Sequence, residues 1–377
     1  MGGEAMRAVQ AESKPVLQVR EPKIIWEIGT ACDLFVSLHV LHHPGDFGLR
    51  PAWAAGMRAR LPAVERATLE HAAELLECPI HFIPRWILQL AEPKDTAAAL
   101  RALREMAPEE RILPRWIYED EGDDPGVEAM RAVHEKGAWL PEHKEKLREC
   151  RLSSGLRATD ELLERVLETW SKPAAFGERY LTAMRTYYEV FYKEEETRIR
   201  PALEKAVAQG RELAETHSFV DVAEELSRGV RLAQPPQVAE VIMVPSYWLT
   251  PIFYQDPLGK DQFLMVFGAR PKNASLISGE IVPDALVETL KAIADPTRLR
   301  ILRYLTSEAL TPAQLAQRLR LRAPTVIHHL KGLRLAGLVQ IQVDEEKDKR
   351  YAARLDTIRS AFGDLDELLR SGEGEEA

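Results

Sequence analysis

Cysteine is scarce in this sequence. The 377 residues include three cysteines, Cys32, Cys78 and Cys150, an odd and widely spaced set. Such a set excludes a disulfide framework and favours a reduced, cytoplasmic protein. The longest uncharged run, Val241 to Gln255, holds two prolines and is shorter than the ~20 apolar residues that a membrane helix needs. The N-terminal residues lack an apolar core, so we expect no secretory signal and no membrane partner.

Sequence motifs of common enzyme classes are also missing. The chain has no dinucleotide-binding G-x-G-x-x-G, P-loop, G-x-S-x-G or H-E-x-x-H motif. Histidines cluster at His39, His42 and His43, but the last two fall at the expected end of a helix, where such side chains are common. We therefore predict no enzyme, no cofactor and no metal site. An unrecognised enzymatic N-terminal domain stays open as an alternative, because site residues are brought together by the fold.

Charge is distributed unevenly along the chain. The whole sequence carries a net charge of −9. Between Pro296 and Val343, however, eight Lys and Arg stand against Glu308 alone, which gives this segment a charge of +7. Phosphate attraction acts over about 8 Å at physiological ionic strength, so a basic surface on an acidic protein can still bind DNA.

A helix-turn-helix is predicted between Thr311 and Leu338. Thr311 is suited to cap the first helix, Pro312 favours its first position, and Gln314 completes a T-x-x-Q capping box. The second helix carries one apolar stripe, formed by Val326, Leu330 and Leu333. A core-packed second helix of this kind is what enters the DNA major groove.

The far side of the second helix is polar and mostly cationic. Ile327, His328 and Lys331 point away from the apolar stripe, with Arg334 at the edge and Thr325 on a flank. The alternative is an ordinary helical hairpin whose basic face is only solvated. The predicted DNA-binding residues, including two from a following hairpin, are Arg322, Thr325, Ile327, His328, Lys331, Arg334, Lys349 and Arg350.

The flanking segments extend the unit to a winged helix. Gly337 is expected to end the second helix, and two alternating runs, 339–343 and 351–355, predict a β-hairpin after it. Two helices are expected upstream, one with Leu286, Leu290 and Ile293 and one starting at Asp295-Pro296. A last helix begins near Asp356.

The segment from Pro283 to Leu355 is very similar to the ArsR/SmtB family of bacterial transcriptional regulators. Asp-Pro-Thr-Arg at 295–298 and His-His-Leu-Lys at 328–331 carry the match. The resemblance implies a dimeric, DNA-binding repressor or activator that answers a signal. Relatives commonly have a small polar N-cap before the recognition helix and a serine in it, where this chain has Arg322-Ala323 and Ile327. The side chain of Ile327 would therefore contact a thymine methyl group.

The metal-sensing positions of the family are unfilled in this sequence. Thr311-Pro312-Ala313 stands where metal sensors carry a cysteine pair, and the last helix contains neither histidine nor cysteine. The resemblance thus implies a member that senses something other than a metal.

The chain before the winged helix is predicted to be mostly helical. Helices are expected over 63–77, 95–106, 127–150 and 157–170, and over 176–200, where Pro201 should kink or interrupt the helix before it continues to His217. A Met and aromatic stripe on that helix, from Tyr180 to Phe191, indicates core packing, with the wall of a ligand cavity as the alternative. The runs 238–244, 249–254 and 262–267 predict a small antiparallel meander.

A looser resemblance covers most of this N-terminal part. Long ArsR-type regulators with a helical N-terminal domain of unassigned function share an early WEI…LFVSLHVLHHP-like helix, an IPRW-like turn and a VPS segment with aromatics. The expected fold is mainly α with a small β portion. The predicted units are a disordered N-terminus (1–22), a helical sensor domain (23–235), a β meander or connector (236–280), a winged helix-turn-helix (281–370) and an acidic tail (371–377).

The sequence therefore predicts a cytoplasmic, homodimeric transcriptional regulator, with a repressor favoured. Its partners would be operator DNA of pseudo-palindromic sequence and a small-molecule effector or a protein sensed by the helical domain. A protein-docking module that uses the winged helix, or an enzyme domain fused to it, stays open as an alternative. The predicted dimerisation residues are Leu286, Leu290, Ile293, Ile358, Phe362, Leu365 and Leu369.

Overall fold

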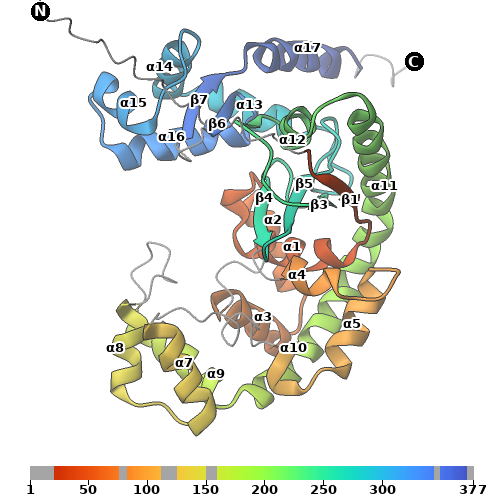
Figure 1. The fold of residues 1–377 in the computed structure, drawn as a ribbon, viewed down its shortest axis with the longest axis vertical. Helices are drawn as coiled ribbons and strands as arrows, with labels where there is room; N and C mark the ends of the chain where they lie inside the picture. The colour runs from red at the N-terminus through yellow and green to blue at the C-terminus, as the bar shows by residue number, and fades with distance from the viewer. Residues whose placement is uncertain (1–20, 76–82, 112–124, 150–158, 344–348, 372–377) are drawn as a thin grey trace, which may run out of the picture.

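Helices dominate the architecture, as predicted, and the strands form two small sheets. The structure is a computed structural model that describes residues 21–75, 83–111, 125–149, 159–343 and 349–371. The elements trace an open arc in Figure 1, with the C-terminal helices at one end and the helices of residues 125–171 at the other. Most of the predicted N-terminal and acidic tails, 1–20 and 372–377, lies outside the described residues.

Residues 21–280 are called the N-terminal body below. Its elements are β1 (Lys23–Trp26), α1 (Ala31–His42), η1 (Pro44–Asp46), α2 (Pro51–Ala59), α3 (Ala63–Leu75), α4 (Ile83–Leu88), α5 (Thr96–Glu105), η3 (Pro108–Arg111), α7 (Pro125–Lys136), α8 (Pro141–Glu149), α9 (Asp160–Ser171), α10 (Pro173–Tyr187), the π-helical η4 (Tyr188–Tyr192), α11 (Lys193–Thr216), α12 (Phe219–Leu226), β2 (Val230–Leu232), β3 (Glu240–Ser246), β4 (Tyr254–Leu258) and β5 (Gln262–Gly268).

The C-terminal region follows from residue 281 onward. Its elements are α13 (Asp284–Ile293), α14 (Pro296–Leu305), α15 (Pro312–Leu319), α16 (Ala323–Leu335), β6 (Val339–Val343), β7 (Lys349–Ala353) and α17 (Leu355–Ser371). It has an apolar core of its own, built by residues such as Ile301, Leu315 and Leu330. This matches the predicted order of helices, hairpin and final helix.

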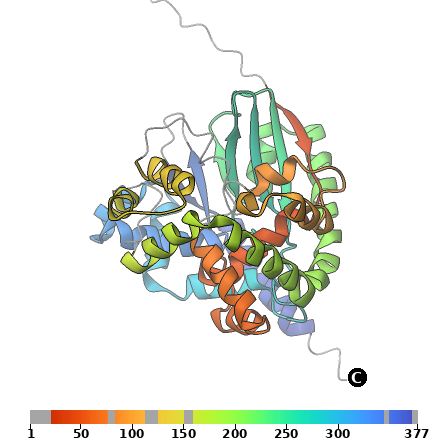
Figure 2. The ribbon, with the colours of Figure 1, turned by 90° about the horizontal axis from the view of Figure 1, so that it is seen from below.

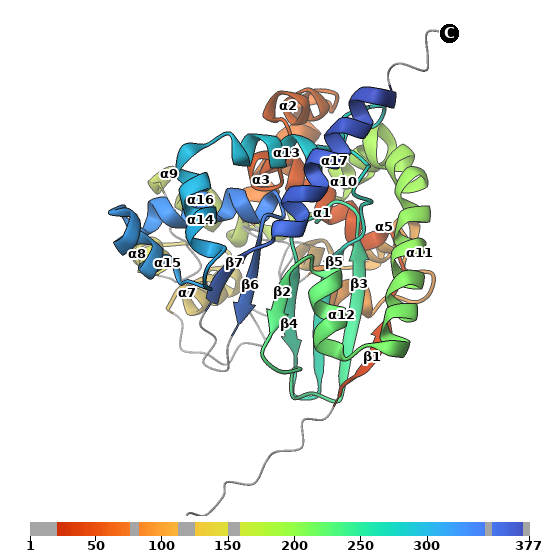
Figure 3. The ribbon, with the colours of Figure 1, turned by 90° about the horizontal axis from the view of Figure 1, so that it is seen from above.

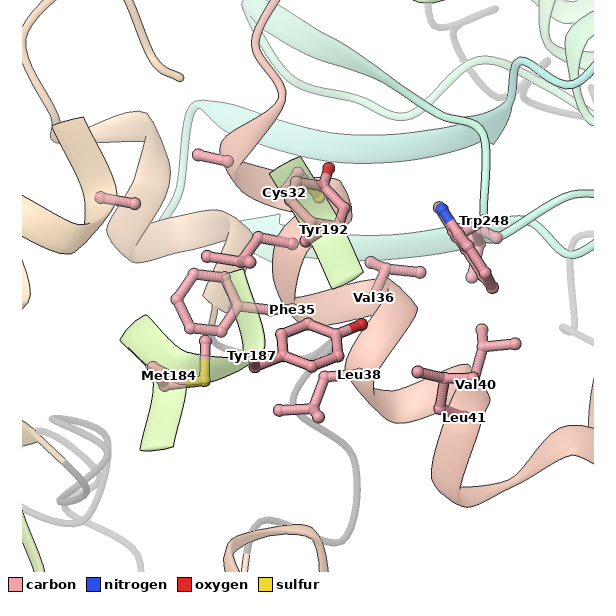
Figure 4. Packing of buried hydrophobic residues seen from close by; sticks show 14 of the residues in the cluster. Cys32, Phe35, Val36, Leu38, Val40, Leu41, Met184, Tyr187, Tyr192 and Trp248 are labelled. Atoms are coloured by element: carbon pink, nitrogen blue, oxygen red, sulfur yellow. The ribbon is translucent and has the colours of Figure 1, made fainter. Parts of the chain in front are cut away.

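Helix α1 is the centre of the main core in the N-terminal body. Every residue from Ala31 to Leu41 is buried, which requires neighbours on all sides of the helix. Figure 4 shows Tyr187, Tyr192 and Trp248 closing around it. Of the predicted Met and aromatic stripe, Tyr180, Met184, Tyr187 and Phe191 are buried in this core, whereas Tyr188 is only half-buried.

The predicted antiparallel meander is wrong in its pairing. The strand order is β1-β3-β5-β4, and β5 pairs in parallel with β3 and antiparallel with β4. The chain leaves β3 through the buried turns at 247–251, so the run predicted as a strand over 249–254 reaches strand conformation only at Tyr254. Strand β4 then lies at the sheet edge, and β5 returns between β4 and β3. The other edge is β1, from far earlier in the sequence, which pairs in parallel with β3.

The sheet packs in the same core as the helices. Ile242, Val244, Leu264 and Val266 share one apolar cluster with α1 and α10. On the other face of the sheet, Trp26 and Phe267 pack edge to face, with 6.2 Å between their ring centroids. Both belong to an apolar cluster that includes residues of α11. Figure 2 shows β1 at the sheet edge beside this helix. The sheet therefore packs with α1, α10 and α11 in one folded unit.

The predicted interruption of the helix at Pro201 does not occur. Helix α11 continues through Pro201, whereas the interruption lies upstream, in the π-helical residues 188–192. Pro201 has no N–H to donate to the carbonyl of Thr197, four residues earlier. Both residues are exposed, so solvent can hydrate that carbonyl. The predicted IPRW-like turn is also helical, because α4 spans Ile83–Leu88.

A buried carboxylate joins α1 to the sheet. Asp33 accepts a hydrogen bond from the Ser246 hydroxyl and, at 2.7 and 3.3 Å, from the backbone N–H groups of Tyr247 and Trp248. Burial raises the pKa of the Asp33 carboxyl from 3.8 to about 6, although these hydrogen bonds oppose the rise. The folded protein therefore holds the Asp33 proton more tightly than the unfolded chain does.

Asp33→Asn should change how stability depends on pH. A raised pKa in the folded state contributes stability that is complete below about pH 4 and is lost as the pH rises through 6. The variant has no such proton to lose. Its free energy of unfolding should therefore gain about 2–3 kcal/mol relative to wild type between pH 4 and 7. Urea unfolding at four pH values measures this difference, and parallel curves for the two proteins would contradict it.

Candidate nucleic-acid interface

Helix α15 begins as predicted. The Thr311 hydroxyl accepts a hydrogen bond from the Gln314 N–H at 3.3 Å, and the Gln314 side chain accepts one from the Thr311 N–H at 2.9 Å. This is the predicted capping box, and it fixes the start of the helix-turn-helix. The turn after α15 places Arg320 at φ 56°, a left-handed conformation that reverses the chain direction.

Helix α16 presents the predicted apolar stripe to the core. Val326, Leu330 and Leu333 are each at most 1% exposed. The helix starts at Ala323 after Arg322, which gives no side-chain cap, so the missing cap predicted from the sequence is confirmed. Gly337, at φ 69°, follows the helix end and accommodates the left-handed turn before β6.

The opposite face of α16 is open to solvent over its first two turns. Arg322, Thr325 and His328 are exposed, and Ile327 has 53% of its surface exposed despite being a large apolar residue. An exposed isoleucine between cationic and hydroxyl side chains is suited to contact base edges while its neighbours bind phosphate. The structure thus brings four of the predicted residues together on one accessible surface.

Lys331 lies on the same face but touches the N-terminal body. Its ammonium group forms an ion pair with Asp46 of η1, and both side chains are 53% exposed. An exposed pair of this kind contributes little stability, so DNA phosphate can replace the carboxylate at small cost. Lys331 is therefore accessible to DNA.

Arg334 does not join this surface. Its guanidinium donates hydrogen bonds to the carbonyls of Ser227, at 2.7 Å, and Arg228, at 3.0 Å. These carbonyls follow the end of α12, where a helix carries partial negative charge. Arg354 donates to the Arg228 carbonyl as well, at 2.8 Å. Burial lowers the pKa of Arg334 to about 10, so it remains charged at neutral pH. The predicted role of Arg334 in DNA contact is not supported by this geometry.

The hairpin that follows α16 is present. Strand β6 pairs antiparallel with β7, from Val339 opposite Ala353 to Val343 opposite Lys349. Lys349 and Arg350 are exposed at the start of β7, and the acidic turn, 344–348, lies outside the described residues. The two cations are therefore accessible, as predicted.

A third strand in this sheet was missed by sequence reasoning. Strand β2 of the N-terminal body pairs in parallel with β6, with Val230 opposite Ile341 (Figure 3). The backbone bonds Ile341 N–H to Gly229 O, 2.8 Å, and Ala233 N–H to Val343 O, 3.0 Å, complete the pairing. Three residues give too short a pattern to predict a strand, and the partner lies about 110 residues away.

Gly332 and Arg298 form another contact that was missed. A Cβ at position 332 would lie 2.6 Å from a guanidinium nitrogen of Arg298. The glycine therefore lets Arg298 of α14 cross α16 closely. Asp295 caps α14 and lies 3.9 Å from His329 of α16. A glycine in the middle of an otherwise regular helix was the signal that could have pointed to this close approach.

The predicted dimerisation residues divide into two groups. Leu286 is buried, and Leu290, Ile293 and Ile358 are half-buried, with Ile293 and Ile358 packed against the C-terminal core. Along α17, in contrast, Phe362 and Leu369 are 54% and 67% exposed, and Leu365 is half-buried. Leu355, 44% exposed, begins the same heptad-spaced row. The first group packs within the chain, and the second forms an uncovered apolar face.

The comparisons with known proteins agree with this geometry. A family model described as a helix-turn-helix domain matches residues 293–342. The chain is 36% identical over 94 residues to the HTH-type transcriptional regulator CmtR of Mycobacterium bovis, a match over 25% of this chain and 79% of that protein. The same protein from Mycobacterium tuberculosis strain H37Rv matches equally. The chain belongs to the helix-turn-helix transcriptional regulators.

Membership of this family makes the exposed face of α16 the candidate DNA-binding surface. This regulator binds DNA through its helix-turn-helix, and α16 is the second helix of that motif. Within the described ranges, no helix is both long and apolar enough to cross a membrane. The matched residues 293–342 lie wholly in the C-terminal region, so the N-terminal body is additional to the matched unit.

Proposed function

We propose that the chain is a homodimeric repressor of the ArsR type whose N-terminal body senses an effector other than a metal. The observation that carries the proposal is the accessible cationic face of α16, held by a core-packed apolar stripe. The Asp-Pro-Thr-Arg motif supports the ArsR type, because Asp295 caps α14 and Arg298 packs on the recognition helix. The hairpin β6–β7 then corresponds to the wing.

The uncovered face of α17 supports the homodimer. Leu355, Phe362 and Leu369 recur every seven residues, which places them on one side of the helix. Two copies joined through this face would present two recognition helices related by a two-fold axis. Half-sites about 10 base pairs apart, or a multiple of that spacing, are then expected in the operator.

Signal transfer is supported by the contacts between the N-terminal body and the C-terminal region. The β2–β6 pairing fixes the wing, and Arg334 and Arg354 bind the end of α12. An effector that favours another position of α12 and β2 would therefore move the wing and α16 together. The effector must bind one arrangement better than the other for such coupling.

The cysteine pair of metal sensors is replaced by Thr311-Pro312-Ala313, and these residues build the start of α15. Helix α17 has neither histidine nor cysteine in its sequence. Both observations favour a non-metal effector.

Substitutions at Lys331 and Ile327 should separate affinity from specificity. Lys331→Ala should weaken binding several-fold on every DNA sequence and reduce the loss of affinity between 50 and 200 mM salt, because one phosphate contact disappears. Ile327→Ser should instead change which base pairs are preferred, since it removes an apolar contact with a base edge. Footprinting, beginning with the promoter of this protein's own gene, provides the sites for both measurements. Unchanged affinity and footprint in both variants would reject the assigned face.

A further inference from the structure

A groove runs between α5 and α10 on the N-terminal body, away from the DNA-binding face. Its volume is about 710 Å³, within the range of small-molecule sites. Each helix contributes residues at helical spacing: Ala97, Leu100, Arg101 and Arg104 from α5, and Thr182, Arg185, Thr186 and Glu189 from α10 and the start of η4. One side of each helix therefore faces the same hollow.

The groove is strongly cationic in an otherwise acidic chain. Arg101, Arg104 and Arg185 are exposed, and none of them forms an ion pair or side-chain hydrogen bond with another described residue. The carboxylate in the lining, Glu189, is bound by Lys193 at 2.9 Å. Among the described residues that line the groove, three arginines thus stand against the single carboxylate of Glu189. Arginine is the side chain best suited to bind carboxylate or phosphate through two parallel hydrogen bonds.

The floor of the groove is apolar with polar edges. Leu100 and Tyr188 are half-buried and both line the groove. The Thr186 hydroxyl donates to the Thr182 carbonyl at 3.1 Å, so its oxygen can still accept a hydrogen bond. A ligand with an apolar body and charged ends would match this combination.

The groove also adjoins the irregular part of the long helical segment. Tyr188 and Glu189 begin the π-helical turn, and such turns occur frequently at functional sites. Helix α11 continues from this turn and leads through α12 to β2, which pairs with the wing strand β6. The groove therefore lies on a continuous path to the DNA-binding region.

We propose that this groove binds a small organic anion that carries at least two negative charges, as carboxylates or phosphate, on an apolar body. Arg101, Arg104 and Arg185 hold the charged groups, and the Leu100–Tyr188 floor holds the apolar part. The site rests on its own geometry. Its role as the effector site rests on the proposed function.

Calorimetric titration of the full chain without DNA tests the site. Phthalate provides carboxylates on an aromatic ring, and phenyl phosphate provides the phosphate version, each at matched ionic strength. Wild type should bind at least one of them saturably. The double variant Arg101→Gln/Arg185→Gln should weaken that binding at least about tenfold, because two charge-assisted contacts are lost. Arg211→Gln, a change at an exposed arginine of α11, is the matched control and should leave it unchanged.

Three results would overturn the site: no saturable heat with either probe, equal binding by wild type and the double variant, or equal weakening by Arg211→Gln. Both variants should unfold at the wild-type temperature without ligand, because all three arginines are exposed. DNA binding is then measured with and without the bound probe. Anion binding that leaves DNA affinity unchanged keeps the site and removes its effector role. DNA binding without anion binding removes the site and leaves the proposed DNA-binding function standing.

Discussion

Phe362→Asp is expected to convert the protein into a monomer and to lower its affinity for a two-half-site operator at least about 100-fold. The Phe362 side chain is 54% exposed at the middle of the apolar row on α17, so a carboxylate there would be buried without a partner in the proposed dimer. Each copy would then bind one half-site alone and lose the gain from simultaneous contact. Sedimentation equilibrium and gel-shift titration measure the two effects.

The matched control for this substitution is Val64→Asp on α3. Val64 is 66% exposed, so the control introduces the same charge at a comparable apolar surface position. It should leave both oligomeric state and DNA affinity unchanged. If Phe362→Asp remains a dimer, the α17 face is not the interface. If both variants lose affinity equally, the effect is not specific to α17.

Arg334→Met should lower the free energy of unfolding by about 2–3 kcal/mol. Methionine keeps much of the apolar stem of the arginine but leaves the buried carbonyl of Ser227 without the hydrogen bond that Arg334 donates, whereas the Arg228 carbonyl keeps its bond from Arg354. An unpaired buried acceptor of this kind costs more than the loss of an exposed contact. Denaturant unfolding measures the loss.

DNA footprinting of the same variant separates the two roles considered for Arg334. If Arg334 only joins α16 to α12, the footprint should keep its position and base preference. A variant with wild-type stability and a loss of DNA affinity like that of Lys331→Ala would restore the role predicted from the sequence. Lys331→Ala itself should retain stability, because its ion pair with Asp46 is exposed.

Local patterns predicted the DNA-binding helix well. Thr311 and Gln314 lie three residues apart, and the stripe from Val326 to Leu333 spans two turns, so the chain itself holds the information. The exposed face of α16 follows by geometry once the buried face is known.

Contacts distant in sequence could not be predicted in this way. Arg334 carries the same charge as Lys331, and only the position of the carbonyls after α12, more than 100 residues earlier, makes it a structural residue. The sheet order failed for a similar reason, because β1 comes from the far N-terminus and β5 inserts between β3 and β4. The groove required α5 and α10 to meet, which no spacing within either helix indicates.

The pairing of β2 with β6 has a consequence for how this molecule could have arisen and how it folds. A strand shared between two modules makes them interdependent: neither can be exchanged for an unrelated module without leaving an open strand edge. A replacement for either module would therefore have to supply a strand that pairs with the one that remains. The paired segments are separated by some 110 residues, so bringing them together costs chain entropy. The β2–β6 pairing is therefore expected to form late in folding, after the N-terminal body and the C-terminal region have each folded.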